Sequence, residues 1–211
     1  MAGKRLSKDP YNLIITGVGG QGNVMASRVL ANMLLDKGFY VTIGETFGAS
    51  QRGGSVMSHL RISGKASWSP QIPAGSADIV VALEPIESVR VLKDYGNPSI
   101  KILSNTRPIQ PVGVIAGDLD YPGLDEIKGI AREMASNAWF IDATDKAMEL
   151  GNPILGNIIM LGALAGIGIL PLDKQGFKKV ISSTVAKDRL DINLKAYDIG
   201  VGMVRKTRRR A

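Results

Sequence analysis

The chain has 211 residues, which is the size of one domain. It contains no cysteine and a single histidine, so this chain alone excludes thiolate-held iron–sulfur or zinc sites, disulfides, a thiol nucleophile and polyhistidine metal centres. Its 26 basic and 19 acidic residues give a net charge of +7, and much of that charge lies near the two ends. The 45% hydrophobic content is typical of a soluble globular domain.

The first third of the sequence predicts a β–loop–α–β unit. A short apolar strand at 12–16 runs into a glycine-rich loop, and the helix that follows closes at Gly38, before a second strand at 40–43. Such a unit is the building block of a parallel sheet. A polar, glycine-rich loop over 46–54 then leads to an alternating strand at 55–62.

The middle of the chain alternates strands and helices. An apolar run at 78–83 is typical of a strand covered on both faces, and Pro85 opens a helix near 86–93. Four further elements are predicted, namely strands at 100–103, 112–116 and 139–141 and a helix at 124–136.

The last third is predicted to be helical, with no convincing strand after Asp142. Three helices are expected, at 153–166, at 174–185 with Asp173 as its N-cap, and at 188–204. The apolar stretch 154–170 falls short of the roughly 20 residues of a membrane helix, so we expect it to be buried in a soluble core. Together, the elements predict an α/β, Rossmann-like three-layer sandwich with a mostly parallel sheet and a helical C-terminal third.

The expected organisation is a single domain between two basic tails. The domain covers 11–204, and the tails cover 1–10 and 205–211. The first apolar run is too short for an export signal, and we expect a cytoplasmic protein. No aromatic residues interleave with the C-terminal basic run, so base stacking there has no support and we expect a solvated tail. A non-catalytic module whose charge binds nucleic acid or an acidic partner remains the alternative.

The glycines 17, 19 and 22 follow the spacing of a dinucleotide-binding loop between a strand and a helix. Glu45 ends the second strand, where a ribose-binding acid could lie. The pattern allows a stand-alone NAD(P)- or FAD-dependent dehydrogenase. It equally allows a tight strand–helix turn packed against protein, or a loop facing another ligand, and Gln21 does not decide between these.

The loop at 46–54 has a second ligand-type pattern. Arg52 stands beside Gly53 and Gly54, so a guanidinium lies next to accessible backbone amides, which suits a phosphate or a carboxylate. A surface loop without a ligand is the alternative. Both glycine-rich loops follow predicted strands, and the carboxyl ends of parallel strands share one sheet edge. We therefore expect the two loops to form a common surface.

Two polar residues fall in apolar surroundings. His59 is predicted to be a packed or surface structural residue, because no carboxylate is visibly placed to pair with it. Asn157 lies in the apolar helix and must find partners if it is buried, either as a hydrogen-bond clamp of the core or as a ligand contact.

Three blocks in this order resemble a known family: GVGGQG at 17–22, ETFGASQRGG at 45–54, and Asn157 followed by MLGA at 160–163. They are similar to the gamma-type component of 2-oxoacid:ferredoxin oxidoreductases, over about 11–204. The second block is most like the indolepyruvate type, in which this component is the beta subunit. The glycine motif alone is a weak signal, whereas the three blocks together are fairly specific.

The resemblance implies a function for a whole complex. The family's enzymes oxidatively decarboxylate a 2-oxoacid, here an arylpyruvate such as indolepyruvate, join the acyl group to coenzyme A and pass electrons to ferredoxin. Thiamine diphosphate and the iron–sulfur clusters belong to the partner alpha subunit in the indolepyruvate type. This chain is then expected to hold no cofactor or metal, to be inactive alone, and to bind neither membrane nor nucleic acid. A homodimer of the isolated chain stays open.

The resemblance also implies which residues face the partner's active site. Arg52 is expected to contact a coenzyme A phosphate or the substrate carboxylate, and Glu45 to orient the loop and not to bind ribose. No residue of this chain is assigned as a general acid or base. The residues predicted to bind ligand or to face the partner's active site are Gly17, Gly19, Gly20, Gln21, Gly22, Glu45, Thr46, Phe47, Gly48, Ser50, Gln51, Arg52, Gly53, Gly54 and Asn157.

Overall fold

The computed structural model describes residues 6–47 and 54–208. Its centre is a six-stranded sheet in the order β2-β3-β1-β4-β5-β6. The strands are β1 (Tyr11–Val18), β2 (Tyr40–Phe47), β3 (Ser55–Ser63), β4 (Ile79–Ala82), β5 (Lys101–Asn105) and β6 (Asn137–Ile141). The strands β1, β4, β5 and β6 are parallel neighbours, whereas β3 is antiparallel to both β1 and β2. The predicted mostly parallel sheet is confirmed, with one reversed strand.

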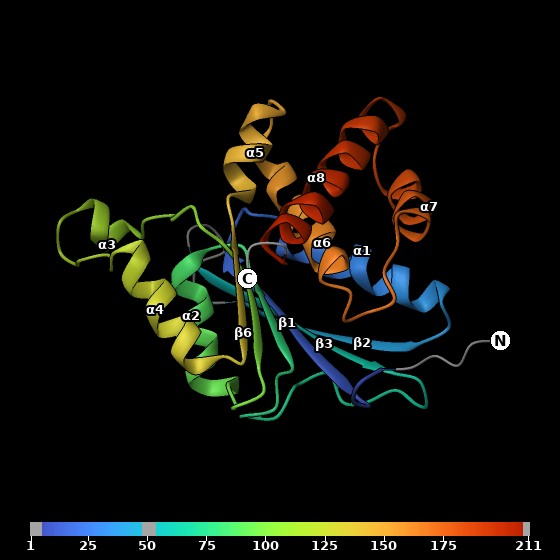
Figure 1. Ribbon diagram of the computed structural model, residues 1–211, viewed down its shortest axis with the longest axis horizontal. Helices are drawn as coiled ribbons and strands as arrows, with labels where there is room; N and C mark the ends of the chain where they lie inside the picture. Colours follow the sequence, from blue (N-terminus) through green and yellow to red (C-terminus); the bar gives the residue numbers. More distant parts are fainter. Residues whose placement is uncertain (1–5, 48–53, 209–211) are drawn as a thin grey trace.

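Helices cover both faces of this sheet, which Figure 1 shows nearly edge-on between them. One face carries α1 (Asn23–Asp36), α6 (Gly156–Ile167), α7 (Lys174–Thr184) and α8 (Leu190–Arg208). The other face carries α2 (Pro85–Tyr95) and α4 (Leu124–Met134). The remaining helices are α3 (Val112–Ile115), α5 (Ala143–Glu149) and two short 3₁₀ turns at Pro153–Leu155 and Lys187–Arg189. The three-layer sandwich is therefore confirmed.

Burial explains why β4 has an unbroken apolar sequence. All four of its residues are buried, with Ile79 and Val81 in the core under α1 and α6, and Val80 and Ala82 in the core under α2. A strand between two helical layers has no solvent face and therefore no polar positions. The prediction of a doubly covered strand at 78–83 is confirmed.

The C-terminal third is helical over its described residues, as predicted. Helix α6 is apolar on all sides because it is buried beneath α8. Glycines allow the close crossing: a Cβ on Gly162 would lie 2.0 Å from the carbonyl oxygen of Tyr197. The predicted cap of α7 is also confirmed, because an Asp173 carboxylate oxygen accepts a hydrogen bond from the Gly176 amide at 2.8 Å. Within the described ranges, no helix is both long and apolar enough to span a bilayer.

Two predictions about the strands are wrong. The run 112–116 is not a strand: it contains the short helix α3, within a long connection from β5 to α4. Short apolar runs do not distinguish strand from helix, and β6 takes the place beside β5. The strand predicted at 40–43 is present and extends to Phe47, but the parallel pairing with β1 that the β–loop–α–β unit implied is wrong, because β2 pairs with β3. Strands joined by a short loop pair antiparallel, and this hairpin inserts β3 between β1 and β2.

Candidate functional site

The glycine-rich loop at 17–22 lies where the sheet reverses the side of its connections. β1 leads into α1 on one face, and the neighbouring β4 leads through Leu83 into α2 on the other face. In doubly wound sheets, such a switch point opens a crevice at the carboxyl ends of the strands, and ligands bind there. The fold therefore places the glycine loop at the edge where a ligand site is expected.

A pocket of about 460 Å³ occupies this crevice, and we call it the crevice pocket. It lies between the glycine loop, the ends of β4 and β5, α5 and the start of α6. Its lining combines the backbone of Gly19 and Gly20, the amides of Asn105 and Asn157, and apolar side chains such as Leu83. Such a lining suits a partly apolar ligand that is oriented by a few polar groups.

The Gln21 side chain bridges the ends of β1 and β4 at the base of the crevice. Its Oε1 accepts a hydrogen bond from the Val18 amide at 2.8 Å, and its Nε2 donates to the Leu83 carbonyl oxygen at 2.8 Å. Gly17 leaves the room for this, because a Cβ there would lie 2.6 Å from Gln21 Oε1. Gln21, whose role the sequence left open, therefore links the glycine loop to the end of the neighbouring strand β4.

Asn157 holds the same loop from the side of α6. Its side chain is 3% exposed, and its Nδ2 donates to the Gln21 carbonyl oxygen at 3.2 Å. Gly22 has a φ of +83°, and a Cβ on it would lie 2.2 Å from Nδ2 of Asn157. The structure shows the hydrogen-bond clamp. Because Asn157 also lines the crevice pocket, a ligand contact stays a prediction.

The exposed part of the loop retains hydrogen-bond donors. The N-cap of α1 is Gly22, which has no side chain, and the first turn has no acidic residue, so the first amides and the positive end of the helix dipole have no side-chain partner from the cap or first turn. Gly20 has a φ of +107° and open space around it. A second pocket of about 450 Å³ lies on the β3 side of the loop, lined in part by Asn23 and Ser58. The loop thus forms a ridge between two pockets.

The second predicted loop lies largely outside the described residues. This applies to Gly48, Ser50, Gln51, Arg52 and Gly53, and nothing is described of the Phe47 side chain.

The two ends of that loop can be placed. Glu45 and Thr46 are exposed near the end of β2. The Gly54 carbonyl oxygen accepts a hydrogen bond from the Gly19 amide at 2.9 Å, so the second loop returns to the sheet beside the glycine loop. Both loops therefore leave the same edge of the sheet, although β3 lies between β1 and β2. A common surface of the two loops stays a prediction.

The dinucleotide interpretation fails on topology. A ribose-binding acid belongs at the end of the strand adjacent to β1 on the α1 side. Here β3 occupies that place, so Glu45 lies two strands away from β1. The stand-alone dehydrogenase that Glu45 and the glycine spacing allowed is not supported.

Sequence reasoning missed two polar residues of the crevice, Asn105 and Arg107. Asn105, at the carboxyl end of β5, is 2% exposed and donates from Nδ2 to the Leu83 carbonyl oxygen at 3.0 Å and to Thr144 Oγ1 at 2.9 Å. Arg107 lines the pocket and pairs with Asp145 at 2.7 Å, with both side chains about half exposed. Asn105 could have been found as a polar residue at the end of a strand. It was missed because the predicted strand ended at 103, two positions before it.

A second missed group is the buried carboxylate of Glu84, directly after β4. It caps α2 by accepting from the Glu87 amide at 3.1 Å, and it also accepts from the Ile109 amide at 3.3 Å and from the Tyr121 hydroxyl. Burial raises the pKa of Glu84, although these hydrogen bonds oppose the rise. Since Ile109 lines the crevice pocket, Glu84 supports part of its wall.

His59 is structural, as predicted. It is fully buried on the α2 face of β3, where its Nδ1 accepts from the Ile72 amide at 3.3 Å and its ring meets Tyr95 edge-on. Burial lowers the pKa of His59. In the part of the chain that the structure describes, no group of three His, Cys, Asp or Glu side chains is arranged to hold a metal ion.

Comparison with known proteins identifies the family. Residues 12–203 match the family described as pyruvate ferredoxin/flavodoxin oxidoreductase. The chain belongs to this family. The indolepyruvate oxidoreductase subunit IorB of Pyrococcus horikoshii is 39% identical over 192 residues, which cover 90% of this chain and 94% of that relative. The family resemblance drawn from the three sequence blocks is confirmed.

Two solved structures share the fold. The pyruvate oxidoreductase subunit PORC of Thermotoga maritima superposes with a TM-score of 0.68 at 23% identity, covering 93% of this chain and 97% of that one. The 2-oxoglutarate:ferredoxin oxidoreductase of Magnetococcus marinus gives a TM-score of 0.72 at 20% identity, covering 94% of this chain but only 32% of that longer one. The fold thus occurs both as a whole chain and as one part of a longer chain.

Proposed function

We propose that this chain is the subunit without iron–sulfur clusters of a 2-oxoacid:ferredoxin oxidoreductase, with indolepyruvate or another arylpyruvate as substrate. The complex oxidatively decarboxylates the 2-oxoacid, transfers the acyl group to coenzyme A and delivers the electrons to ferredoxin, in the cytoplasm. The observation that carries the proposal is the 39% identity to an indolepyruvate oxidoreductase subunit over nearly the full length of both chains.

The donor set of this chain assigns the redox groups to a partner. Iron–sulfur clusters need thiolate ligands, and the sequence has no cysteine. It also lacks a thiamine diphosphate motif of the Gly-Asp-Gly…Asn-Asn type. The residues therefore do not fit these cofactors, and the proposal places both in an alpha-type subunit that this chain contacts.

In this proposal, the chain contributes the shape and polarity of one wall of the active site. The crevice pocket offers amides, backbone groups and apolar side chains, and the nearby Glu84 carboxylate already accepts three hydrogen bonds. A fully buried carboxylate that already accepts three hydrogen bonds, and that has little room for a substrate proton, is a poor general base. We therefore assign binding and orientation to this chain and the bond-breaking steps to the partner.

Arg52 is proposed to bind the anionic end of coenzyme A or of the 2-oxoacid. Support comes from the sequence of its loop and from the bond between Gly19 and Gly54, which brings the end of that loop to the crevice edge. A charge-assisted hydrogen bond contributes about 1.5–3 kcal/mol, which corresponds to roughly a 10–100-fold change in affinity.

Steady-state kinetics of the purified complex test this role. Arg52→Ala is expected to raise KM for coenzyme A or for the 2-oxoacid roughly 10-fold or more, and Arg52→Lys to raise it less. The matched control is Arg28→Ala, which removes an exposed arginine of α1. Unchanged kinetics with both ligands in Arg52→Ala would remove Arg52 from the site.

A further inference from the structure

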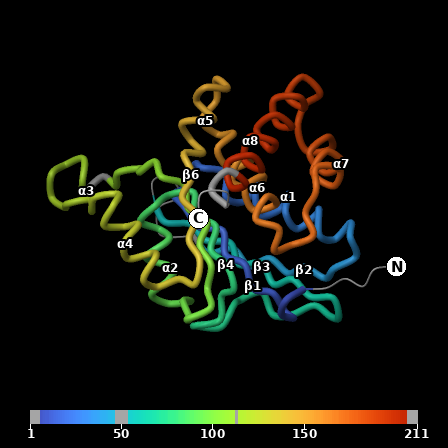
Figure 2. The backbone as a smooth tube through the Cα atoms, in the orientation of Figure 1, coloured from blue at the N-terminus to red at the C-terminus, as the bar shows by residue number. Residues whose placement is uncertain are grey.

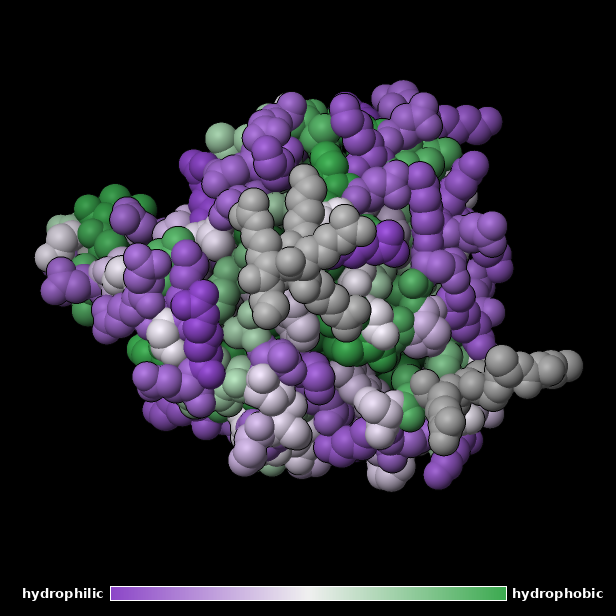
Figure 3. Space-filling model, viewed as in Figure 1, coloured by the Kyte–Doolittle hydropathy of each residue, from purple (hydrophilic) through white to green (hydrophobic). Residues whose placement is uncertain are grey.

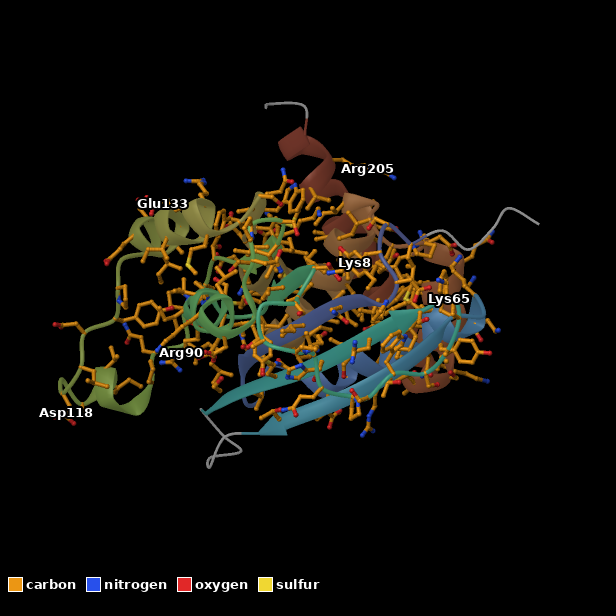
Figure 4. The ribbon with its side chains drawn as sticks, turned by 90° about the horizontal axis from the view of Figure 1, so that it is seen from below. Lys8, Lys65, Arg90, Asp118, Glu133 and Arg205 are labelled. Atoms are coloured by element: carbon orange, nitrogen blue, oxygen red, sulfur yellow. The ribbon has the colours of Figure 1, made fainter. Side chains whose placement is uncertain are left out.

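A long connection leaves the body of the protein between β5 and α4. It covers residues 106–123, whereas βα connections in such folds usually have roughly 2–6 residues. In Figures 1 and 2, α3 and the residues around it project away from the sheet and its helices, and Figure 4 shows Asp118 at the far end of the projection. We call residues 107–121 the α3 arm.

The tip of the α3 arm exposes large apolar side chains. Ile115 is 72% exposed and Leu119 is 63% exposed, the highest values among the large hydrophobic residues that the structure describes. Figure 3 shows a hydrophobic patch at this projecting end. At the base of the arm, Ile109 is 39% exposed on the rim of the crevice pocket. Exposed apolar surface of this kind marks a site of contact with another molecule.

The base of the arm is held in place by one carboxylate. The Ile109 amide near the start of the arm and the Tyr121 hydroxyl at its end both donate to Oε1 of Glu84. Glu84 is fully buried and caps α2, so it is itself fixed. The arm is therefore fixed at its base, and its helix α3 makes no substantial contact with another helix or strand of the described chain.

The charge of the arm indicates which kind of partner could cover its tip. Beyond Arg107, which pairs with Asp145 at the base, the arm contains Asp118 and Asp120 and no basic residue, in a chain with a net charge of +7. An anionic lipid surface repels such a tip, so it does not suit membrane binding. A convex projection also does not enclose a small molecule. The surface that fits is a protein groove with an apolar floor and basic side chains at its edges.

We propose that the α3 arm docks into such a groove on the partner subunit that carries the redox groups, an inference that rests on the proposed function. In the larger enzyme from Magnetococcus marinus, the same fold forms 32% of the chain, so this fold also occurs joined to further protein. Since Arg107 and Ile109 at the base of the arm line the crevice pocket, the docked partner also lies at the mouth of that pocket.

Binding measurements with paired variants test the proposal. The double variant Ile115→Asp/Leu119→Asp is expected to weaken association with the partner subunit at least ~100-fold, as for central anchors of an interface. The control, Leu35→Asp, replaces a 47% exposed leucine at the end of α1, and it should change the affinity less than ~3-fold. Both isolated variants should unfold near the wild-type temperature, because neither removes a buried contact.

A second variant tests the charge. Asp118→Lys/Asp120→Lys is expected to slow association at low salt and to remove most of its dependence on ionic strength, with little change in dissociation. Wild-type affinity in both double variants overturns the proposal. Loss of a homodimer, or of binding to phosphatidylserine vesicles, in the Ile115→Asp/Leu119→Asp variant also overturns it, because the tip then serves a second copy or a membrane.

Ferredoxin reduction by the wild-type complex tests the proposed function separately. A wild-type complex that requires Ile115 and Leu119 to assemble but does not oxidise a 2-oxoacid contradicts the proposed function and leaves the docking role of the arm intact. A complex that assembles equally well with the arm variants and still oxidises a 2-oxoacid contradicts the docking role of the arm and leaves the proposed function intact.

Discussion

Gly22 and Gly117 share a left-handed backbone but differ in what surrounds them. Both have a φ of +83°. A Cβ on Gly22 would lie 2.2 Å from the Asn157 amide nitrogen, whereas a Cβ on Gly117 would have nothing within 4 Å. Alanine at Gly117 therefore tests only the left-handed backbone, whereas alanine at Gly22 also tests the clash with Asn157, which binds the glycine loop.

Alanine at each position measures these two costs. Gly117→Ala is expected to lower the free energy of unfolding by about 1–2 kcal/mol, the cost of a left-handed residue with a side chain. Gly22→Ala is expected to cost at least ~1 kcal/mol more, because the added methyl group displaces Asn157. Urea unfolding of the isolated chain gives both values. Equal losses would show that Asn157 does not hold the loop.

His59 makes stability depend on pH in a predictable direction. Burial lowers the pKa of His59 below the ordinary value, so the folded protein binds this proton more weakly than the unfolded chain does. The contribution to stability is complete above the ordinary pKa of about 6.5 and is lost as the pH falls toward the lowered pKa. Protonation would also end the hydrogen bond that Nδ1 accepts from Ile72.

Unfolding free energies measured between neutral and mildly acidic pH check this. Acidification below about pH 6.5 should destabilise the wild type more than His59→Gln, because only the wild type has this titrating ring. Because the sequence has one histidine, its ring signal in proton NMR can be followed directly. A ring that titrates at the ordinary pKa in the folded protein would contradict the expected burial effect.

Most elements could be predicted from local patterns, and the exceptions have physical causes. The run 78–83 and the Asp173 cap carry their signals within a few residues, so both were predictable. The neighbour of β1 was not, because strand order depends on how the β2–β3 hairpin joins the sheet. The run 112–116 looks like a strand in sequence, but there is no free strand for it to pair with beside β5.

The candidate site was predictable only where a local signal reveals it, namely the glycine spacing at 17–22 and the polar Asn157 in an apolar helix. The loop at 17–22 shows its place between a strand and a helix through local glycine spacing, whereas Asn105 and Glu84 act through partners far along the chain. Asn105 bonds to Thr144, and Glu84 bonds to Tyr121. Such pairs leave no local pattern, so the crevice wall and the anchor of the α3 arm could not be inferred from one sequence.

The crossing of α6 and α8 provides a test at the scale of elements. A Cβ on Gly200 would lie 1.9 Å from the Ile159 carbonyl oxygen, while Gly202 on the same helix has open space. Gly200→Ala is therefore expected to lower the free energy of unfolding by about 1–3 kcal/mol. Gly202→Ala should be neutral or stabilise by up to about 1 kcal/mol, from helix propensity alone. Thermal unfolding compares them, and a tolerated Gly200→Ala would mean that the helices cross less closely.

In the proposed function, the whole molecule supplies position and shape to a complex. Its crevice pocket, the ridge of the glycine loop and the α3 arm lie around one edge of the sheet, and the sequence has no cysteine to bind a cluster. Family membership over residues 12–203 agrees with this division of roles between subunits.

Anaerobic ferredoxin reduction, measured on the purified chain with and without its partner subunit, tests this division most directly. The isolated chain should be colourless and inactive. Addition of the partner should give reduction that requires both a 2-oxoacid and coenzyme A. An isolated chain that is brown, or that oxidises a 2-oxoacid unaided, would contradict the account.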